Sequence, residues 1–278
     1  MTAAIIGMGL IGGSMSLVLK RSNFVTRVIG IENNEQHAQK AIALGLADEV
    51  MELDEALKHA QLIIIATPVD AAEILLPQLL DKITHQVVMD VGSIKNAVLQ
   101  LIRHHSKKGR FVATHPMWGT EYSGPEAAVQ DAFAGKATVI CNKEDCDDDA
   151  LELVKKIYGF LQMHIVYMNA EEHDMHVAYV SHISHITSFA LANTVLEKER
   201  EEGAIFELAS GGFESTVRLA KSNAAMWVPV LMQNRENVLD VLNEHIAQLK
   251  KFKACLEKEN SVYLEELIVR ANGISKII

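Results

Sequence analysis

The stretch AAIIGMGLIGGS, residues 3–14, decides the fold of this 278-residue chain. It joins a short apolar run, residues 3–6, to a GxGxxG pattern that opens a helix-like segment ending near Lys20. Strand, glycine turn and helix in this order are typical of a dinucleotide-binding unit, because the turn brings the helix N-terminus against the pyrophosphate. The stretch predicts a nucleotide-binding α/β domain at the start of the chain.

Each glycine of the pattern has its own task. Gly7 permits a tight turn, Gly9 lets the backbone approach a pyrophosphate, and Gly12 allows the helix to pack closely on the strand. Leu10 and Ile11 stand between these glycines, and we expect them to line the same cofactor site.

An acidic residue stands where a ribose would need it. The apolar run of residues 27–31 ends in Glu32, 20 residues past Gly12, where a carboxylate would bind the adenosine ribose hydroxyls. Asn33 follows and offers no cation for a 2′-phosphate, so the sequence favours NAD over NADP. The alternative is a glycine turn beside a solvated glutamate.

Strand and helix patterns alternate beyond this turn, which predicts a doubly wound parallel sheet. The predicted strands are residues 27–31, 61–66, 87–89, 111–114, 137–141 and 164–167, and the predicted helices are residues 35–44, 54–59, 70–80, 94–106 and 147–161. In such sheets ligands lie beyond the carboxyl ends of the strands. That rule groups Thr67-Pro68, Gly92-Ser93 and His115 with the glycine turn. Thr67-Pro68 could also be a strand terminator only, and Ser93 the N-cap of the helix that follows.

The pattern changes near Asn169, after which only helix signals remain. Helices are expected from residue 171 to about residue 200, around the glycines 211 and 212, and over residues 226–258 and 262–271. We therefore expect two domains, an α/β domain of residues 1–168 and a helical domain of residues 169–278.

The composition indicates a folded protein, with 49% hydrophobic and 22% charged residues. A net charge of -10 argues against nucleic acid or an anionic membrane as partner, and the longest apolar run, residues 60–69, is too short to span a bilayer. The first residues lack the features of a signal peptide, so a cytoplasmic location is expected. Cys141, Cys146 and Cys255 form no close pair, which suggests neither a disulfide framework nor a zinc site.

Four histidines, His173, His176, His182 and His185, lie on one predicted helix. On a straight helix the first two point about 120° to 180° away from the last two, so they cannot share one metal ion, and no metal is expected. Either of the last two could be a core histidine or a donor to a carboxylate. Further on, Arg218 follows two glycines and could bind a substrate carboxylate, or its stem could merely cover Trp227.

Taken together, these motifs resemble the prephenate/arogenate dehydrogenase family of tyrosine biosynthesis. The resemblance covers nearly the whole chain and rests on five motifs in the family's order: GMGLIGGS (residues 7–14), DVGSIK (90–95), HPMWGTE (115–121), VSHISH (180–185), and GGF (211–213) leading to Arg218 and Met226-Trp227.

The resemblance implies an NAD-dependent oxidoreductase that decarboxylates prephenate to 4-hydroxyphenylpyruvate, in a homodimer. His115 would accept the hydrogen bond of the ring hydroxyl, with Ser93 orienting it near the nicotinamide. The remaining implied substrate contacts are Arg218 and His185 on the carboxylate, Glu121 and His182 at the pocket, and Trp227 at its edge.

Two residues depart from the family pattern. Ser215 stands where an acidic residue often precedes the arginine, which leaves open how Arg218 is held. Trp118 replaces a small residue and could narrow the pocket or close a subunit contact. The length of the chain suggests a monofunctional enzyme.

Other functions remain open at this stage. Arogenate could be the substrate in place of prephenate, giving tyrosine directly. A hydroxyacid dehydrogenase of similar build would use Lys221 or Lys95 as its acid and base, and an NAD-sensing protein would bind the nucleotide without turnover.

Overall fold

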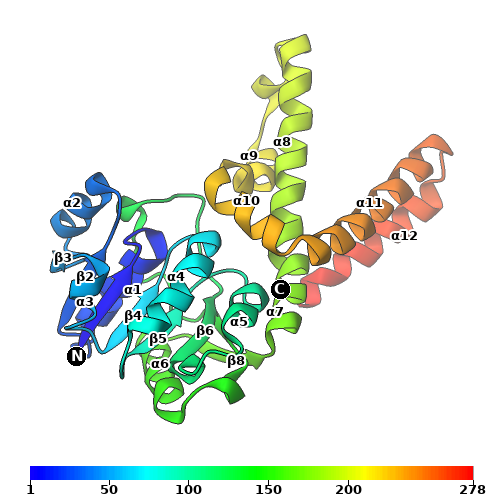
Figure 1. Cartoon of the computed structure of the whole chain (residues 1–278). Helices are drawn as coiled ribbons and strands as arrows, with labels where there is room; N and C mark the ends of the chain where they lie inside the picture. The colour runs from blue at the N-terminus through cyan, green and yellow to red at the C-terminus, as the bar shows by residue number, and fades with distance from the viewer. Residues whose placement is uncertain (278) are drawn as a thin grey trace.

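The computed structural model describes residues 1–277 as an α/β domain joined to a set of long helices (Figure 1). The strands are β1 (Thr2–Ile6), β2 (Arg27–Ile31), β3 (Glu49–Val50), β4 (Leu62–Ile65), β5 (Val87–Asp90), β6 (Phe111–Pro116), β7 (Ala137–Cys141) and β8 (His164–Met168). They form one sheet in the order β3-β2-β1-β4-β5-β6-β7-β8. This confirms the doubly wound sheet predicted from the alternating strand and helix patterns.

The last two strands run against the other six. β1 to β6 are parallel, whereas β7 pairs antiparallel with β6, and β8 pairs parallel with β7. The predicted parallel sheet therefore carries one antiparallel pairing, that of β7 with β6, which the sequence did not indicate. The connection between β6 and β7 contains no long helix to carry the chain back to the start of the sheet, so β7 enters from the other end.

Helices cover both faces of the sheet. They are α1 (Leu10–Arg21), α2 (Glu35–Ala43), α3 (Leu53–Ala56), α4 (Val69–Lys82), α5 (Asn96–Ile102) and α6 (Asp148–Phe160). One buried cluster joins α1 and α6 to the sheet, and a second joins α3, α4 and α5 to its other face. Two of these helices are shorter than their patterns predict, since α3 spans four residues and α5 starts only at Asn96.

The chain after β8 is helical, as predicted. Its helices are α7 (Ala170–Val177), the π-helical turn η4 (Ala178–His182), α8 (Ile183–Glu202), α9 (Gly211–Val217), the 3-10 turn η6 (Arg218–Lys221), α10 (Ala224–Gln233), α11 (Arg235–Glu257) and α12 (Ser261–Asn272). Within residues 1–277, no helix combines the length and the apolar character needed to cross a bilayer.

Two predictions for this helical part were wrong. The helix bearing the four histidines is interrupted by η4, so it does not keep the straight geometry assumed for it. The segment expected as one helix from residue 226 is two helices, because the backbone breaks at Asn234, whose side chain bonds to neighbouring helices.

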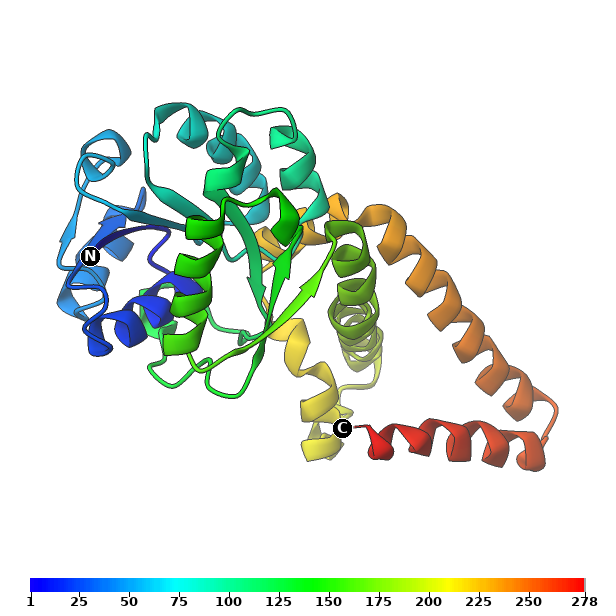
Figure 2. The same cartoon turned by 90° about the horizontal axis from the view of Figure 1, so that it is seen from below.

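The helices leave the α/β domain in different directions. Figure 1 shows α8 rising from the junction beside α5, and α11 and α12 projecting to the other side as two helices joined by a short turn. Figure 2, turned by 90°, shows the same pair extending well beyond the sheet. A small buried cluster, Val69 and Ile94 with Trp227 and Val230, joins the α/β domain to α10.

Candidate active site

The glycine turn between β1 and α1 has the geometry that its sequence predicts. Gly7 has a φ of +95°, and a Cβ there would lie 2.6 Å from the carbonyl oxygen of Ala66. A Cβ on Gly12 would lie 2.1 Å from the carbonyl oxygen of Gly7, whereas a Cβ on Gly9 would meet nothing within 4 Å. Gly9 therefore faces open space at the N-terminus of α1, which begins at Leu10 and continues through Ile11.

Glu32 lies beside this turn, at the end of β2. Its Oε2 accepts a hydrogen bond from the backbone N–H of Met8 at 3.1 Å, and its Oε1 accepts one from the N–H of Asn34 at 3.0 Å. The side chain is partly exposed. These two bonds fix the carboxylate at the mouth of the turn, where the second lone pair of each oxygen is still available.

The neighbouring strand ends supply further polar groups. Thr67 follows β4, and its Oγ1 is buried without a hydrogen-bond partner in the part of the chain that the structure describes. A buried hydroxyl without a partner is costly, so a ligand atom is expected to satisfy it. Pro68 starts α4 as its N-cap residue, and the N–H of Gly92 donates to Asp90 Oδ2 at 3.0 Å. The cradle thus fits a dinucleotide.

His115 lies on β6, at the same edge of the sheet, and is held by a chain of hydrogen bonds. Its Nδ1 lies 2.9 Å from Nε2 of His173, and Nδ1 of His173 lies 2.7 Å from Oδ1 of Asp174. His173 and Asp174 are both buried on α7. Asp174 also accepts the backbone N–H groups of Lys95 and Asn96, at 2.9 and 2.8 Å.

These contacts determine which nitrogen of His115 is free. A carboxylate can only accept, so Nδ1 of His173 carries a proton and its Nε2 is the acceptor for Nδ1–H of His115. Nε2 of His115 is then left with its lone pair. Burial lowers the pKa of His115 well below its ordinary value, and repulsion by His173, Lys95 and His182 adds to this effect. The ring is therefore neutral at pH 7 and able to accept a proton.

His173 and Asp174 are the residues that sequence reasoning missed. His173 was considered only as one of four possible metal ligands, and no role was predicted for Asp174. The spacing within α7 could not reveal their partner, because His115 lies 58 residues earlier in the chain. Within residues 1–277, no group of three or more metal-ligating side chains is found.

Ser93 lies in the turn after β5, half-buried. Its alternative reading as an N-cap is wrong, because α5 starts at Asn96 and its N-cap residue is Lys95. No hydrogen bond joins the side chains of Ser93 and His115 in the described part of the chain, residues 1–277.

The two lysines of the rival hypothesis have other partners. Lys95 is fully buried, forms an ion pair with Asp90 and donates to the carbonyl oxygen of Thr114 at 2.7 Å. It therefore joins the ends of β5 and β6. Lys221 is exposed, with Glu214 at 3.9 Å. Neither lysine is placed as a free acid or base beside the glycine turn.

Three aromatic residues of the helical part lie together. The ring of His185 stacks on Trp227 with 3.5 Å between centroids, and His182 meets the same indole edge-on at 5.9 Å. Asn234 Nδ2 contacts His182 Nδ1 at 3.2 Å and donates to the carbonyl oxygen of Asp174 at 2.6 Å. Burial lowers the pKa of His182 to about 4 and also lowers that of His185. The His182 ring is thus neutral at pH 7.

Arg218 is held by an acid from the other domain. Its Nη1 donates to Oε2 of Glu121 at 2.9 Å, with Arg218 half exposed and Glu121 largely buried. Glu121 therefore positions Arg218 in place of the acidic residue that Ser215 replaces. The Ser215 hydroxyl itself donates to the carbonyl oxygen of Gly212.

Trp118 packs inside its own domain. Its ring meets Phe133 edge-on at 5.3 Å and contacts the buried cluster on the α1 and α6 face of the sheet. Neither role weighed from the sequence, narrowing the pocket or closing a subunit contact, is needed to explain it.

A dinucleotide turn, a half-buried neutral histidine at the same sheet edge and a helical second domain define the class: a two-domain nucleotide-dependent oxidoreductase. Family models narrow this further. The prephenate dehydrogenase nucleotide-binding domain matches residues 15–167, and the prephenate dehydrogenase dimerization domain matches residues 169–269. The chain belongs to the prephenate dehydrogenase family.

Individual relatives agree. The chain is 32% identical over 264 residues to a prephenate dehydrogenase of Bacillus subtilis, covering 94% of this chain and 71% of the relative. It is similar to the crystal structure of A. aeolicus prephenate dehydrogenase in complex with hydroxyphenyl propionate and NAD+, with a TM-score of 0.89, 28% identity and 99% and 97% of the two chains covered. It is also similar to Synechocystis arogenate dehydrogenase, with a TM-score of 0.76, 25% identity and 99% of each chain covered.

Proposed function

We propose that this chain catalyses the NAD+-dependent oxidative decarboxylation of prephenate to 4-hydroxyphenylpyruvate, a step of tyrosine biosynthesis. The observation that carries the proposal is the hydrogen-bonded chain from Asp174 through His173 to His115. It leaves Nε2 of a neutral histidine ready to accept a proton. Family membership and the similarity to a prephenate dehydrogenase structure that contains NAD+ support the same reaction.

The cofactor would be held by the turn of Gly7, Gly9, Leu10, Ile11 and Gly12. Glu32 would bind the ribose hydroxyls, since its carboxylate lies beside the turn, and the Thr67 hydroxyl, Pro68 and Gly92 would complete the wall. Glu32 also favours NAD over NADP, because a 2′-phosphate would meet a like charge. NAD+ supplies the hydride acceptor when bound.

His115 is the proposed catalytic residue. Its Nε2 takes the proton of the ring hydroxyl while the hydride leaves the same carbon, and the carbonyl that forms allows carbon dioxide to depart and the ring to become aromatic. Asp174 is a positioning residue that acts through His173. It fixes the tautomer of both rings and stabilises the positive charge that develops on them.

The substrate carboxylate would be met by Arg218 and His185. Glu121 orients Arg218 through the ion pair between the domains, and His182 and Trp227 form the aromatic wall of the pocket. Ser93 is proposed to orient the ring hydroxyl near the nicotinamide, a role that rests on its place after β5. Residues 1–168 and 169–278 are the proposed cofactor and substrate domains.

The decisive experiment measures NADH absorbance with purified protein, NAD+ and either prephenate or arogenate. We expect turnover with prephenate. Arogenate is the second candidate, because the chain is also similar to an arogenate dehydrogenase. Turnover with a 3-hydroxyacid alone, or NAD+ binding with no substrate-dependent reduction, would refute the proposal.

The variant His115→Asn tests the mechanism. It keeps a side chain of similar polarity but removes the basic Nε2, so we expect kcat to fall by about 10²- to 10⁴-fold while the Kd for NAD+ stays the same. Binding of NAD+ measured by fluorescence titration serves as the control for folding.

A further inference from the structure

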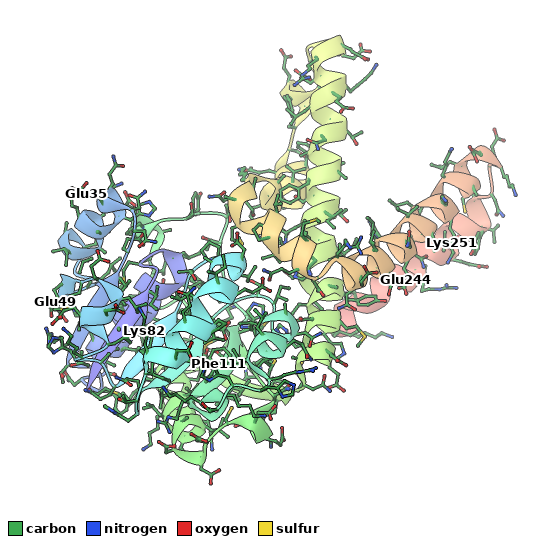
Figure 3. The ribbon with its side chains drawn as sticks, viewed as in Figure 1. Glu35, Glu49, Lys82, Phe111, Glu244 and Lys251 are labelled. Carbon is green, nitrogen blue, oxygen red and sulfur yellow. The ribbon has the colours of Figure 1, made fainter. Side chains whose placement is uncertain are left out.

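A separate cavity of about 290 Å³ lies between α5, the start of β6, the end of β7 and the start of α7. None of the proposed cofactor or substrate residues lines it. Figure 3 labels Phe111, one of its lining residues, and shows it well below α9 and α10. A volume near 300 Å³ is at the lower end of the range of small-molecule sites.

The cavity combines apolar surface with one arginine, Arg103, whose Nε donates to Nε2 of His104 at 2.7 Å and which has no carboxylate partner among residues 1–277. Leu99, Phe111 and Cys141 supply apolar surface, while Arg103 and Gln100 stand exposed at its edge.

The other charges at the cavity cancel each other. Lys108 Nζ contacts Asp145 Oδ1 at 2.7 Å, and the pKa of Asp145 is lowered by its hydrogen bond from this lysine. The net positive charge is therefore that of Arg103, whose planar guanidinium matches a carboxylate. These features favour a small ligand that has one negative charge and an otherwise apolar structure.

The walls of the cavity are bonded to the elements that position His115. Asn142 Oδ1 accepts the N–H of Ala170, the first residue of α7, at 2.9 Å. On the opposite wall, the N–H of Asn96 donates to Asp174 Oδ2 at 2.8 Å. A ligand that moves either wall changes the position of α7, and with it the position of His173 and Asp174.

We propose that this cavity is a second binding site, for a small carboxylate with an aromatic or aliphatic body, and that its occupancy alters turnover by shifting α7 against α5. The effect on turnover rests on the function proposed above, whereas binding does not. A metabolite of this chemical class would thus control the enzyme from outside its active site.

Binding is tested by isothermal titration calorimetry with phenylacetate, with 2-phenylethanol as its uncharged counterpart. Arg103→Glu and Gln100→Trp, which reverse the charge and fill the edge of the cavity, should weaken phenylacetate binding by about tenfold or more. Lys156→Glu is the matched control, because Lys156 is exposed on α6, away from the cavity, and should bind as the unchanged chain does. 2-Phenylethanol should bind more weakly than phenylacetate.

The variant Arg218→Ala separates this site from the active site. Phenylacetate binding that survives in Arg218→Ala and is lost in Arg103→Glu supports the proposal. Binding that is lost in Arg218→Ala, that persists in Arg103→Glu, or that is absent from the unchanged chain overturns it, whatever the substrate of the enzyme proves to be.

The coupling to turnover is tested at saturating prephenate, where competition at the active site is negligible. Coupling between sites usually changes affinity by about 5- to 150-fold, and we expect an effect of the smaller size, about fivefold, on kcat when phenylacetate is added to the unchanged chain or to Lys156→Glu. Arg103→Glu should keep its basal kcat and lose this response. An unaltered kcat in the unchanged chain, with binding intact, overturns the regulatory part.

Discussion

At the scale of single residues, the proposed reaction depends on keeping Nε2 of His115 unprotonated. His115 is half-buried, and its partial burial together with repulsion by His173, Lys95 and His182 lowers its pKa. Protonation would remove the lone pair that accepts the substrate proton. Because the pKa lies well below 6.5, we expect kcat/KM to stay constant from pH 8 down through pH 6.5 and to fall only at lower pH. A pH-rate profile that falls already near pH 7 would contradict this assignment.

Asp174 gives a second prediction at this scale. In Asp174→Asn the amide can still bond, but it no longer holds the negative charge that fixes the His173 tautomer. We expect kcat to fall by about 10²-fold or more with little change in KM, and the acid limb of the pH profile to shift. Glu171 is an exposed acid three residues earlier on α7, so Glu171→Gln is the control and should retain the kcat and the pH profile of the unchanged chain.

The Asp174 comparison needs a check on stability, because the same carboxylate also accepts two backbone N–H groups of α5. Denaturant unfolding separates the two effects. A fall in kcat without the shifted pH limb would indicate a structural role only.

Arg218 is the third residue with a clear prediction. Removing the guanidinium in Arg218→Ala deletes a charge-assisted contact worth about 1.5 to 3 kcal/mol, so KM for prephenate should rise by about 10- to 100-fold with kcat less affected. Glu121→Gln should give a smaller increase, since the arginine remains but loses the partner that orients it. An unchanged KM for prephenate in Arg218→Ala would mean that Arg218 does not bind the substrate and only forms its ion pair with Glu121.

At the scale of elements, the β1–α1 turn allows matched variants that separate binding from folding. A Cβ at Gly9 meets open space, so Gly9→Ala should leave the Tm unchanged but raise the Kd for NAD+, because the methyl group stands where a pyrophosphate approaches. A Cβ at Gly12 would collide with the backbone of Gly7, so Gly12→Ala should destabilise the fold by about 1 to 3 kcal/mol. Thermal unfolding gives the Tm of both variants, and fluorescence titration gives their Kd for NAD+. If Gly9→Ala binds NAD+ as tightly as the unchanged chain, the turn does not contact the cofactor.

How far the sequence predicted these elements depended on the range of the interactions involved. The glycine turn and the strands predicted after it are local patterns, and they lie close to where the sequence placed them, whereas the two-residue strand β3 was not predicted. The chain of hydrogen bonds at His115 is not local, since it joins His115 on β6 to His173 on α7, and no periodicity within α7 marks a partner 58 residues away. The π-helical turn at residues 178–182 and the break at Asn234 also escaped prediction, because tertiary contacts of His182 and Asn234 accompany them.

At the scale of the whole molecule, the long helices leave too much apolar surface uncovered for a single chain. On α11 and α12 the exposed large apolar side chains are Leu239, Ile246, Leu249, Leu256, Val262, Tyr263, Ile268 and Val269. Only Val238, Val241, Cys255 and Leu267 are buried there. An apolar surface of this extent on projecting helices is typical of an interface, and residues 169–269 match a dimerization domain. We therefore infer a homodimer built through these helices.

This inference predicts which substitutions separate the subunits. The unchanged chain should elute with about twice the 30.7 kDa mass of one copy. Leu249→Glu and Val269→Glu place charges on side chains that are 55% and 62% exposed in one copy, and both should lower the mass toward that of a monomer. Ile74→Glu is the control, since Ile74 is 70% exposed on α4, away from α11 and α12. Light scattering after gel filtration measures the mass of all four proteins. A monomeric unchanged chain would contradict the homodimer, and a dimer that only Ile74→Glu dissociates would show that its interface does not involve α11 and α12.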